Sequence, residues 1–355
     1  MTARTVEGTC PKRSVTGCAA AAAASAIWRA AIAAALAGLY VGLAGPAAAQ
    51  PVTLRFGQVP STLRAVTSIY LFIAEHKGFL AREGIRLEFI PIEGGTDKMV
   101  GALDAGRVDV AHTATPYLIQ AELAGSDTVA IAGEVANPVY SLIVRPEIAG
   151  YADLKGKQIG LSLPVDTISI SMRRLLAQKG LGAADYTVKE LVGTPVRFAC
   201  LKSGECAGVP LGQPNDLEAL EQGYRRLGDS TQTVSAFQFQ VIAVRRAFAA
   251  ANKGALVHFV RALADAFRFI RDPAHREDAV NAIVALTGTS DDIARATLAL
   301  YLDPDRGVLS QHAEIDLGGL AQVIAFMGDG GTIKPPLPAP EKFVDLQYLR
   351  AAGVE

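Results

Sequence analysis

The stretch of sequence that decides the fold is GIRLEFIPIEGGTDKMVGALDAGRVDVAHTATP, residues 84–116. Its first part, 85–92, is rich in branched and aromatic side chains and predicts a buried strand. A Gly-Gly turn and a short helical pattern run through Leu103 and end at Gly106, and 108–113 predicts a second strand. Such a strand–helix–strand unit is right-handed with parallel strands. The sequence therefore predicts an α/β fold.

Two loops leave the carboxyl ends of these predicted strands, at 93–97 and 113–116. Both are small, polar and rich in Gly and Thr. Open α/β sheets bind ligands beside the carboxyl ends of their strands, and helix N-termini attract anions. We therefore expect these loops to form part of a ligand site.

A weaker copy of the unit follows about a hundred residues later, as VKELVGTPVRFACLKSGECAGVPLGQP, residues 188–214. When 103–106 is set over 201–204, each block reads strand, Gly/Thr turn, short helix, Gly stop and strand. Two related α/β units predict two lobes that face each other across a cleft. The alternative is that strand–helix–strand units resemble one another for geometric reasons alone.

The overall composition limits the class of protein. The chain has 355 residues, of which 50% are hydrophobic and 19% charged, which allows a large core and favours two domains. After residue 49 it carries 30 basic and 34 acidic side chains, a net charge of −4. Nucleic-acid-binding proteins have clustered basic surface, so we expect no nucleic-acid partner.

The first 49 residues have the pattern of an export signal. Basic residues come first, an Ala/Leu-rich uncharged run covers 30–44, and Ala47, Ala48 and Ala49 precede Gln50. This predicts a signal peptide at 1–49, cleaved near Ala49/Gln50, and a soluble periplasmic protein. The alternative is an uncleaved membrane anchor, although the uncharged run is short for a span of about 20 apolar residues.

Four cysteines are present, and Cys10 and Cys18 would leave with the signal peptide. Cys200 and Cys206 remain, one on each side of Gly204. In an oxidising compartment this pair predicts a disulfide; two buried reduced thiols are the alternative.

Motifs for catalysis, metals and cofactors are not found. Residues 150–157 resemble a phosphate-binding loop, but Gln158 stands where Ser or Thr must ligate magnesium. The five histidines never occur at paired helical spacing, so no zinc site is expected. His112 ends a predicted strand and is either a ligand contact or a structural histidine. We predict a protein that is not an enzyme, with no catalytic residues, no metal and no cofactor.

Three segments resemble a known family: AEHKGFLAREGI (74–85), ALDAGRVDV (102–110) and YADLKGKQIG (151–160). They resemble the solute-binding proteins of ABC importers for nitrate, taurine and alkanesulfonates, a group that includes binders of the thiamine pyrimidine precursor. The resemblance implies a type II periplasmic binding protein, with two α/β lobes joined by two crossover strands and extra C-terminal helices. We expect the crossovers at 137–145 and 237–244.

The implied domains are a discontinuous lobe 1, 50–142 and 244–355, and a lobe 2, 143–243. One departure from the family pattern is Ala207, which stands where the second repeat usually keeps an acid. The implied function is capture of a small organic solute for an inner-membrane ABC permease. The expected solute is anionic: either a sulfonate-, taurine- or nitrate-like compound or an aromatic carboxylate. The protein is expected to be a monomer. The alternatives are an enzyme on the same fold, related to desulfinases or thiamine-pyrimidine synthases, and a periplasmic ligand sensor.

In this family the ligand lies between the loops at the strand ends. The resemblance therefore implies that the ligand-binding residues are Gln58, Ser61, Arg64, Gly95, Thr96, Thr113, Thr115, Asn137, Asp166, Thr167, Gln213 and Asn215. Thr96, Asp166 and Asn215 are equally well explained as helix N-caps. Arg64 and Arg197 are the cations available for a carboxylate or sulfonate, because Arg binds such groups bidentately; the alternative for each is a solvated surface charge.

Overall fold

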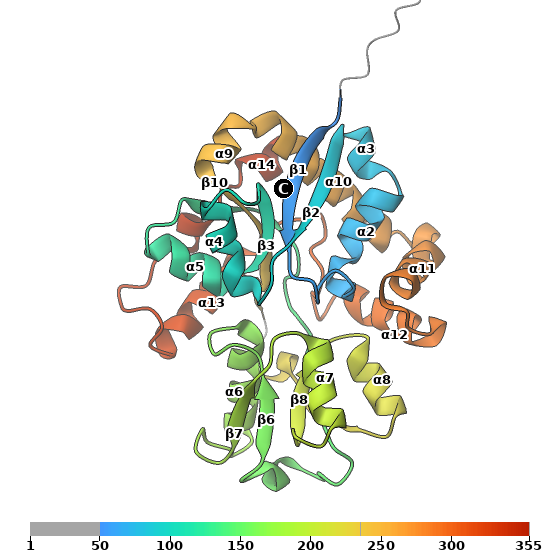
Figure 1. Ribbon diagram of the computed structural model, residues 1–355, viewed down its shortest axis with the longest axis vertical. Helices are drawn as coiled ribbons and strands as arrows, with labels where there is room; N and C mark the ends of the chain where they lie inside the picture. Colours follow the sequence, from blue (N-terminus) through green and yellow to red (C-terminus); the bar gives the residue numbers. More distant parts are fainter. Residues whose placement is uncertain (1–49, 235, 355) are drawn as a thin grey trace, which may run out of the picture. The chain divides into compact units, whose positions relative to one another are not determined.

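Ten strands form two separate five-stranded sheets in the computed structural model, which describes residues 50–234 and 236–354. The predicted signal peptide, 1–49, lies outside the described residues, which begin at Gln50. Figure 1 shows each sheet with its own helices, the second in green and yellow. The chain thus has the two α/β lobes that the sequence predicts.

The sheet of lobe 1 has the order β2-β1-β3-β10-β4. The strands β2, β1 and β3 are mutually parallel, whereas β10 runs antiparallel to β3 and β4. The predicted strand–helix–strand unit therefore lies at one side of this sheet. The strands are β1 (Val52–Gln58), β2 (Ile85–Pro91), β3 (Val110–Ala114), β4 (Thr128–Gly133) and β10 (Gln240–Arg245).

The sheet of lobe 2 repeats this plan in the order β7-β6-β8-β5-β9. Here β6 is parallel to β7 and β8, and β5 runs antiparallel to β8 and β9. In both sheets the antiparallel strand is the one that follows a crossing between the lobes. The strands are β5 (Ser141–Val144), β6 (Gln158–Leu161), β7 (Thr187–Glu190), β8 (Gly208–Leu211) and β9 (Arg225–Asp229).

The two crossovers therefore run through 134–140 and through 230–234 and 236–239, directly before β5 and β10. All of β5 pairs in the sheet of lobe 2 and all of β10 in the sheet of lobe 1. The predicted boundaries at 142/143 and 243/244 fall inside these strands, because each hydrophobic run continues from crossover into sheet without a break in sequence. We propose lobe limits a few residues earlier, within the crossovers.

Helices cover both sheets (Figure 1). The longest, α10, buries Val260, Leu263, Phe267 and Ile270 along one face, as its helical spacing predicts. Lobe 1 carries α2 (Ile69–His76), α3 (Phe79–Arg82), α4 (Met99–Asp104), α5 (Thr115–Leu123), α9 (Arg246–Ala251), α10 (Lys253–Arg271), α11 (Arg276–Thr287), α12 (Asp291–Leu302), α13 (Leu317–Asp329) and α14 (Gln347–Ala351). Lobe 2 carries α6 (Thr167–Gln178), α7 (Thr194–Lys202) and α8 (Asn215–Glu221). Short 3-10 turns are η1 (Val66–Ser68), η2 (Thr96–Lys98), η3 (Tyr151–Leu154), η4 (Ser230–Gln232), η5 (Pro273–His275) and η6 (Pro340–Phe343).

The core of lobe 2 lies on both faces of its sheet. Leu142 and Val144 of β5 pack with α6 residues in one cluster, and Ile143 packs with α7 residues in another. Successive side chains of a strand point to opposite faces, so a continuous apolar run such as β5 marks a strand covered on both sides. This explains why the crossover strands lack the alternation of a half-exposed strand.

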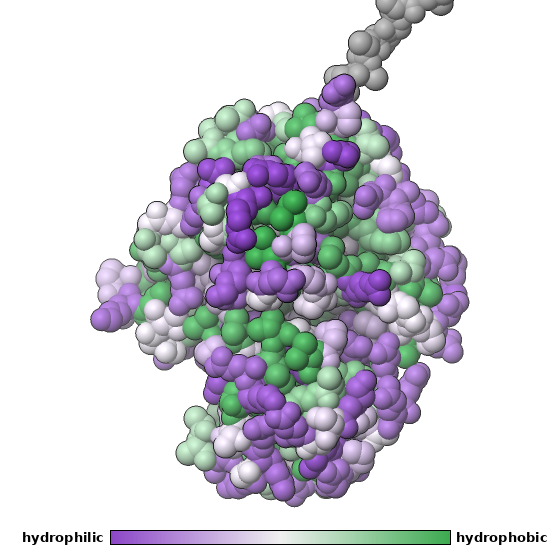
Figure 2. Space-filling model, in the orientation of Figure 1, coloured by the Kyte–Doolittle hydropathy of each residue, from purple (hydrophilic) through white to green (hydrophobic). Residues whose placement is uncertain are grey.

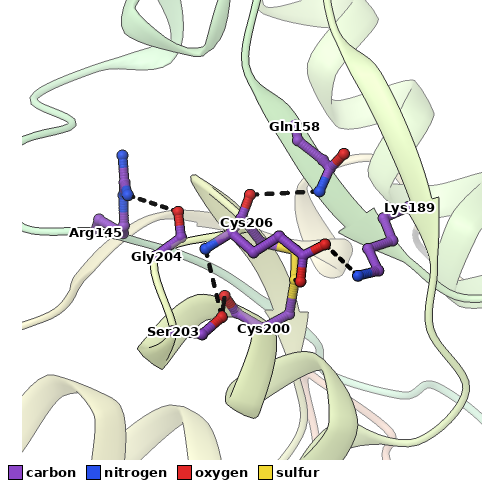
Figure 3. The surroundings of a disulfide bond; sticks show 8 residues. Arg145, Gln158, Lys189, Cys200, Ser203, Gly204 and Cys206 are labelled. Carbon is purple, nitrogen blue, oxygen red and sulfur yellow. Dashed lines mark hydrogen bonds and ion pairs between the residues drawn. A yellow bond between two sulfur atoms is a disulfide. The ribbon is translucent and has the colours of Figure 1, made fainter.

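The predicted disulfide between Cys200 and Cys206 is present (Figure 3). It joins the last turn of α7 to the residue pair before β8, across the left-handed turn at Gly204 (φ 80°). An ion pair between Lys189 and Glu205 lies beside it, and Arg145 donates a hydrogen bond to the Gly204 carbonyl (2.8 Å). The bridge therefore fastens the end of a helix to the strand that follows it.

Hydrophilic side chains cover most of the face drawn in Figure 2, between smaller hydrophobic patches. Among the described residues the exposed large hydrophobic side chains are Val52, Leu123, Val196 and Leu337, which lie far apart in the chain. No helix in this described part has the length and apolar character needed to cross a membrane.

Candidate functional site

A cavity of about 110 Å³ lies where the lobes meet. Its walls come from the loops after β1 and β2 in lobe 1, the loops after β6, β7 and β8 in lobe 2, and both crossovers. These loops leave the carboxyl ends of parallel strands, where α/β sheets bind ligands. The cavity therefore lies at the place that the sequence predicts for a ligand.

The two lobes touch each other at the edge of this cavity through a pair of glycines. A Cβ atom on Gly95 of lobe 1 would lie 3.3 Å from both Leu163 and Val192 of lobe 2. A Cβ atom on Gly193 of lobe 2 would lie 3.2 Å from Ser61 Oγ of lobe 1. Gly193 also has φ 93°, which side chains other than glycine rarely adopt. The conformation is one in which the lobes are closed against each other.

Seven of the twelve predicted ligand residues line the cavity. They are Ser61, Arg64, Gly95, Thr96, Asp166, Gln213 and Asn215. The N-cap alternative is wrong for Thr96 and Asn215, since neither caps a helix with its side chain. It is right for Asp166, which accepts a hydrogen bond from the Ile168 amide at 2.9 Å and lines the cavity as well.

The other five predicted residues do not line the cavity. Gln58, Thr113 and Thr115 are buried inside lobe 1. Gln58 donates to Ser68 Oγ, Thr113 to the Thr96 carbonyl and Thr115 to the Gln238 carbonyl. These strand-end polar groups fix the loops and crossovers instead of facing a ligand. Thr167 is buried at the start of α6, and the backbone of Asn137 donates to the Gly307 carbonyl at 3.1 Å.

The Arg197 guanidinium is the buried cation of the cavity wall. Arg197 is only 1% exposed, so the alternative that it is a solvated surface charge is wrong. Nε donates to the Pro210 carbonyl (2.7 Å), Nη1 to the Leu191 carbonyl (3.1 Å) and Nη2 to Thr194 Oγ1 (3.1 Å). All these partners are neutral, and no carboxylate among the described residues forms an ion pair with Arg197. Burial lowers the pKa of Arg197, against the opposing effects of Tyr140 and Asp166.

Asp166 is the second buried charged residue of the cavity wall and is 7% exposed. Besides the Ile168 amide, it accepts a hydrogen bond from the Ser162 hydroxyl at 2.8 Å. Burial raises the pKa of Asp166, although these hydrogen bonds and the Arg197 charge act in the opposite direction. Arg64, in contrast, is exposed at the same cavity and makes no ion pair with any described residue.

A hydroxyl, an imidazole and a carboxylate follow one another behind the cavity wall. Thr62 lines the cavity, and its Oγ1 lies 3.3 Å from His112 Nε2. His112 Nδ1 lies 3.5 Å from Glu134 Oε2, with both side chains 1% exposed. The order of groups is that of a hydrolytic triad, but Thr62 Oγ1 donates its proton to the Val59 carbonyl at 2.8 Å. His112 therefore supports Thr62 from within lobe 1, which is the structural alternative predicted for it.

Several lining residues were not predicted, among them Thr62, Tyr140, Thr194 and Gln240. The alignment that sets 103–106 over 201–204 also sets Gly95 and Thr96 over Gly193 and Thr194. The second repeat thus contained a signal for its own Gly-Thr loop. No comparable signal marks Tyr140, the last residue of the first crossover, and Gln240, the first residue of β10. No cluster of metal-ligating side chains occurs within 50–234 and 236–354.

Comparison with known proteins identifies a family. The profile of the family described as NMT1/THI5 like matches residues 66–275, which is more than half of the chain. A Haemophilus influenzae protein whose name assigns it to thiamine biosynthesis is 30% identical over 96 residues. That match covers 26% of this chain and spans less than a third, 30%, of the relative.

Three solved structures share the fold. The ligand-binding component of an ABC-type import system from Staphylococcus aureus aligns with TM-score 0.69 and 16% identity, over 84% of this chain and 98% of that one. The nitrate-binding protein NrtA of Synechocystis PCC 6803 aligns with TM-score 0.67 and 15% identity, over 86% and 89%. The periplasmic aliphatic sulphonate-binding protein SsuA of Escherichia coli aligns with TM-score 0.62 and 20% identity, over 83% and 92%. The periplasmic-binding-protein fold follows from these matches.

Proposed function

We propose that this chain, which belongs to the NMT1/THI5-like family, is an exported solute-binding protein that captures a small organic acid and delivers it to an ABC importer. The observation that carries the proposal is Arg197, a buried guanidinium in the wall of a cavity between two lobes, without a carboxylate partner among the described residues. The importer role is supported by the similarity to ligand-binding components of import systems.

The anion preference follows from the cost of burying a charge. A buried ion that lacks a counter-ion is unfavourable by several kcal/mol, roughly. A carboxylate or sulfonate in the cavity would supply that counter-ion, with charge-assisted hydrogen bonds to the guanidinium. Tyr140 lines the same cavity, with 5.8 Å between Arg197 Cζ and its ring centroid. Burial raises the pKa of Tyr140 to about 12, so its hydroxyl stays neutral and does not compete with the ligand.

Closure of the lobes is the proposed mechanism of capture. Ligand contacts come from both lobes, so they are complete only when Gly95 meets Leu163 and Val192 and Gly193 meets Ser61. Further contacts support the closed state, including Arg174 of α6 stacked over Phe326 of α13 at 4.0 Å and paired with Asp329 at 3.7 Å. The permease would then recognise the closed surface formed by both lobes.

Two observations count against the enzyme alternative. The cysteines within the described residues, Cys200 and Cys206, are joined to each other, so neither is free as a nucleophile. The Thr62 hydroxyl donates its proton to a backbone carbonyl instead of to His112. The thiamine-biosynthesis relative keeps the alternative testable, because an enzyme would change the bound compound.

Export to the periplasm is part of the proposal and rests on the sequence of residues 1–49, with cleavage near Ala49/Gln50. The disulfide agrees with an oxidising compartment. We propose a monomer, since one chain supplies both sides of the cavity.

The test is a thermal-shift panel on protein purified from periplasm, with sulfonates, nitrate, aromatic carboxylates and pyrimidines. An organic acid at 100 times its Kd should raise Tm by about 5–10 °C in the wild type. Arg197→Gln should abolish the shift, while Arg86→Gln on the outer strand β2 should keep it. Mass spectrometry after incubation should recover the compound unchanged. A shift that survives in Arg197→Gln, or a converted compound, would contradict the proposal.

A further inference from the structure

The cavity holds two buried charges of opposite sign that are not paired with each other. Arg197 and Asp166 both line it, at 1% and 7% exposure. No ion pair joins them, and neither forms one with another described side chain. Buried charges in proteins are normally paired, because an unpaired ion in a low-dielectric interior is unfavourable. Two such charges in one small cavity therefore need a common explanation.

The fold holds the two groups apart by fastening each to its own surroundings. The guanidinium is held by the carbonyls of Leu191 and Pro210 and by Thr194. The carboxylate is held at the start of α6 by the Ile168 amide and the Ser162 hydroxyl. These neutral partners set the direction of each charged group without neutralising its charge. A ligand between the two groups is placed to supply both missing counter-charges.

A second observation concerns hydrogen-bond acceptors in the same wall. Gln240 lines the cavity, is 4% exposed, and its Oε1 is buried without a hydrogen-bond partner in the described structure. A buried acceptor without a donor is unfavourable. Gln240 Oε1, like the Asp166 carboxylate, therefore favours N–H or O–H donors on the ligand.

We infer that the cavity selects a zwitterionic solute, an organic acid whose acidic group reaches Arg197 and whose ammonium group reaches Asp166. The inference rests on the proposed function and narrows its substrate class. A simple anion such as nitrate or an alkanesulfonate would satisfy Arg197 but would meet the repulsion of Asp166 and leave Gln240 Oε1 without a donor. A compound with both groups neutralises both buried charges at once.

The experiment compares probes that differ only in the amino group. Isothermal titration calorimetry on the exported protein would use taurine against ethanesulfonate, 3-aminopropanesulfonate against propanesulfonate, and 4-aminobutanoate against butanoate. In at least one pair the amino compound should bind ten times or more tightly than its amine-free partner. Asp166→Asn should reduce that ratio to below threefold, because Asn keeps the N-cap and removes the charge. The control Asp272→Asn, at the N-cap of η5 and not part of the cavity lining, should keep the ratio.

The outcomes separate the inference from the proposed function. Amine-free probes that bind as tightly as amino probes, with Arg197→Gln abolishing both, would overturn the inference and leave the proposed function standing. A ratio that persists in Asp166→Asn would also overturn the inference. Binding of no probe in the three pairs would overturn the inference, and the thermal-shift panel with its nitrate and aromatic carboxylates would then decide the proposed function by itself. If Asp166→Asn does not fold, judged by circular dichroism, Asp166→Ser keeps a capping oxygen and gives the same comparison.

Discussion

The two strand–helix–strand units use one backbone plan for different purposes. In lobe 1 the helix after the Gly95-Thr96 turn has Met99 in its first turn, fully buried in the core. In lobe 2 the same position, after Gly193-Thr194, holds Arg197, equally buried but in the wall of the cavity. One unit completes a hydrophobic core, and the other places a cation where the lobes meet.

The units also differ in how the helix end is fastened. In lobe 1, Asp109 binds Arg55 of β1 through two side-chain hydrogen bonds (2.6 and 3.0 Å) and the Arg55 amide (2.9 Å). In lobe 2 the equivalent positions hold Ala207 and Gln158, which keep only the backbone hydrogen bond between them (2.8 Å). Cys200 and Cys206 form the bridge there, at the positions of Ala102 and Val108 in lobe 1.

The difference teaches that the shared scaffold accommodates an ion pair in one lobe and a disulfide in the other, while the buried charges that line the cavity belong to lobe 2. Both Arg197 and Asp166 belong to lobe 2, whereas lobe 1 contributes Gly95, Thr96 and the loop around Thr62. Lobe 2 would select the ligand, and lobe 1 would close over it. Copying residues from one unit into the other, and substituting the paired glycines, tests this difference.

The largest effect is expected from Arg197→Met, which copies the lobe 1 residue into lobe 2. The variant should bind organic acids about 100-fold more weakly, a loss of about 2.7 kcal/mol, because the counter-charge of the ligand is removed. Calorimetry measures the affinity, and circular dichroism checks that the fold is retained. Met99→Leu is the matched control and should leave the affinity unchanged. Equal binding by Arg197→Met would show that the cation has no part in recognition.

The double variant Cys200→Ala/Cys206→Val replaces the disulfide of lobe 2 by the residue types that lobe 1 has at the equivalent positions. It should lower the free energy of unfolding by about 2 kcal/mol, the value expected from loop entropy for so short a loop. Denaturant titration measures the change, and reducing agent should lower the stability of the wild type by a similar amount but leave the variant unaffected. Ligand affinity should be kept, because the bridge does not line the cavity. A variant as stable as the wild type would mean that the bridge adds nothing to the fold.

Alanine substitutions at the paired glycines, Gly193 and Gly95, distinguish the effect of backbone strain from that of steric crowding. Gly193→Ala should weaken ligand binding about tenfold, or by about 1.4 kcal/mol, since it strains a backbone at φ 93° and presses on Ser61 of the other lobe. Gly95→Ala should have a smaller effect, because its closest contact is the flexible end of Asp97 (2.9 Å). Calorimetry on both variants gives the order. A larger loss in Gly95→Ala would contradict this reading of the contact.

The smallest effect is expected from Asp109→Ala, which copies lobe 2 into lobe 1. It should destabilise the protein by about 1 kcal/mol, because the ion pair is partly exposed. Burial alone would raise the pKa of Asp109, but the hydrogen bonds from Arg55 outweigh burial and lower it. The contribution of Asp109 should therefore be complete above the unfolded pKa of about 3.9 and should vanish as pH falls through the lower folded value. Unfolding curves at pH 7 and at acid pH test this; a difference that persists in acid would exclude the ion pair as its cause.

The sequence alone determined the fold class and the ends of the strands that carry the site. Branched and aromatic runs, Gly turns and helical spacing are local properties, so β2, β3, α10 and the Gly95-Thr96 loop could be predicted directly. The disulfide could be predicted too, because Cys200 and Cys206 lie six residues apart around one turn.

Only the tertiary structure decided which polar groups face the cavity. Gln58, Thr113 and Thr115 have the residue types and strand-end positions of ligand contacts, yet neighbours distant in sequence take their hydrogen bonds. Arg197 has the sequence context of a surface helix residue, yet it is buried in the cavity wall, where its guanidinium binds the carbonyls of Leu191 and Pro210. Burial and hydrogen-bond partners come from segments brought together by folding, and local sequence patterns do not contain them.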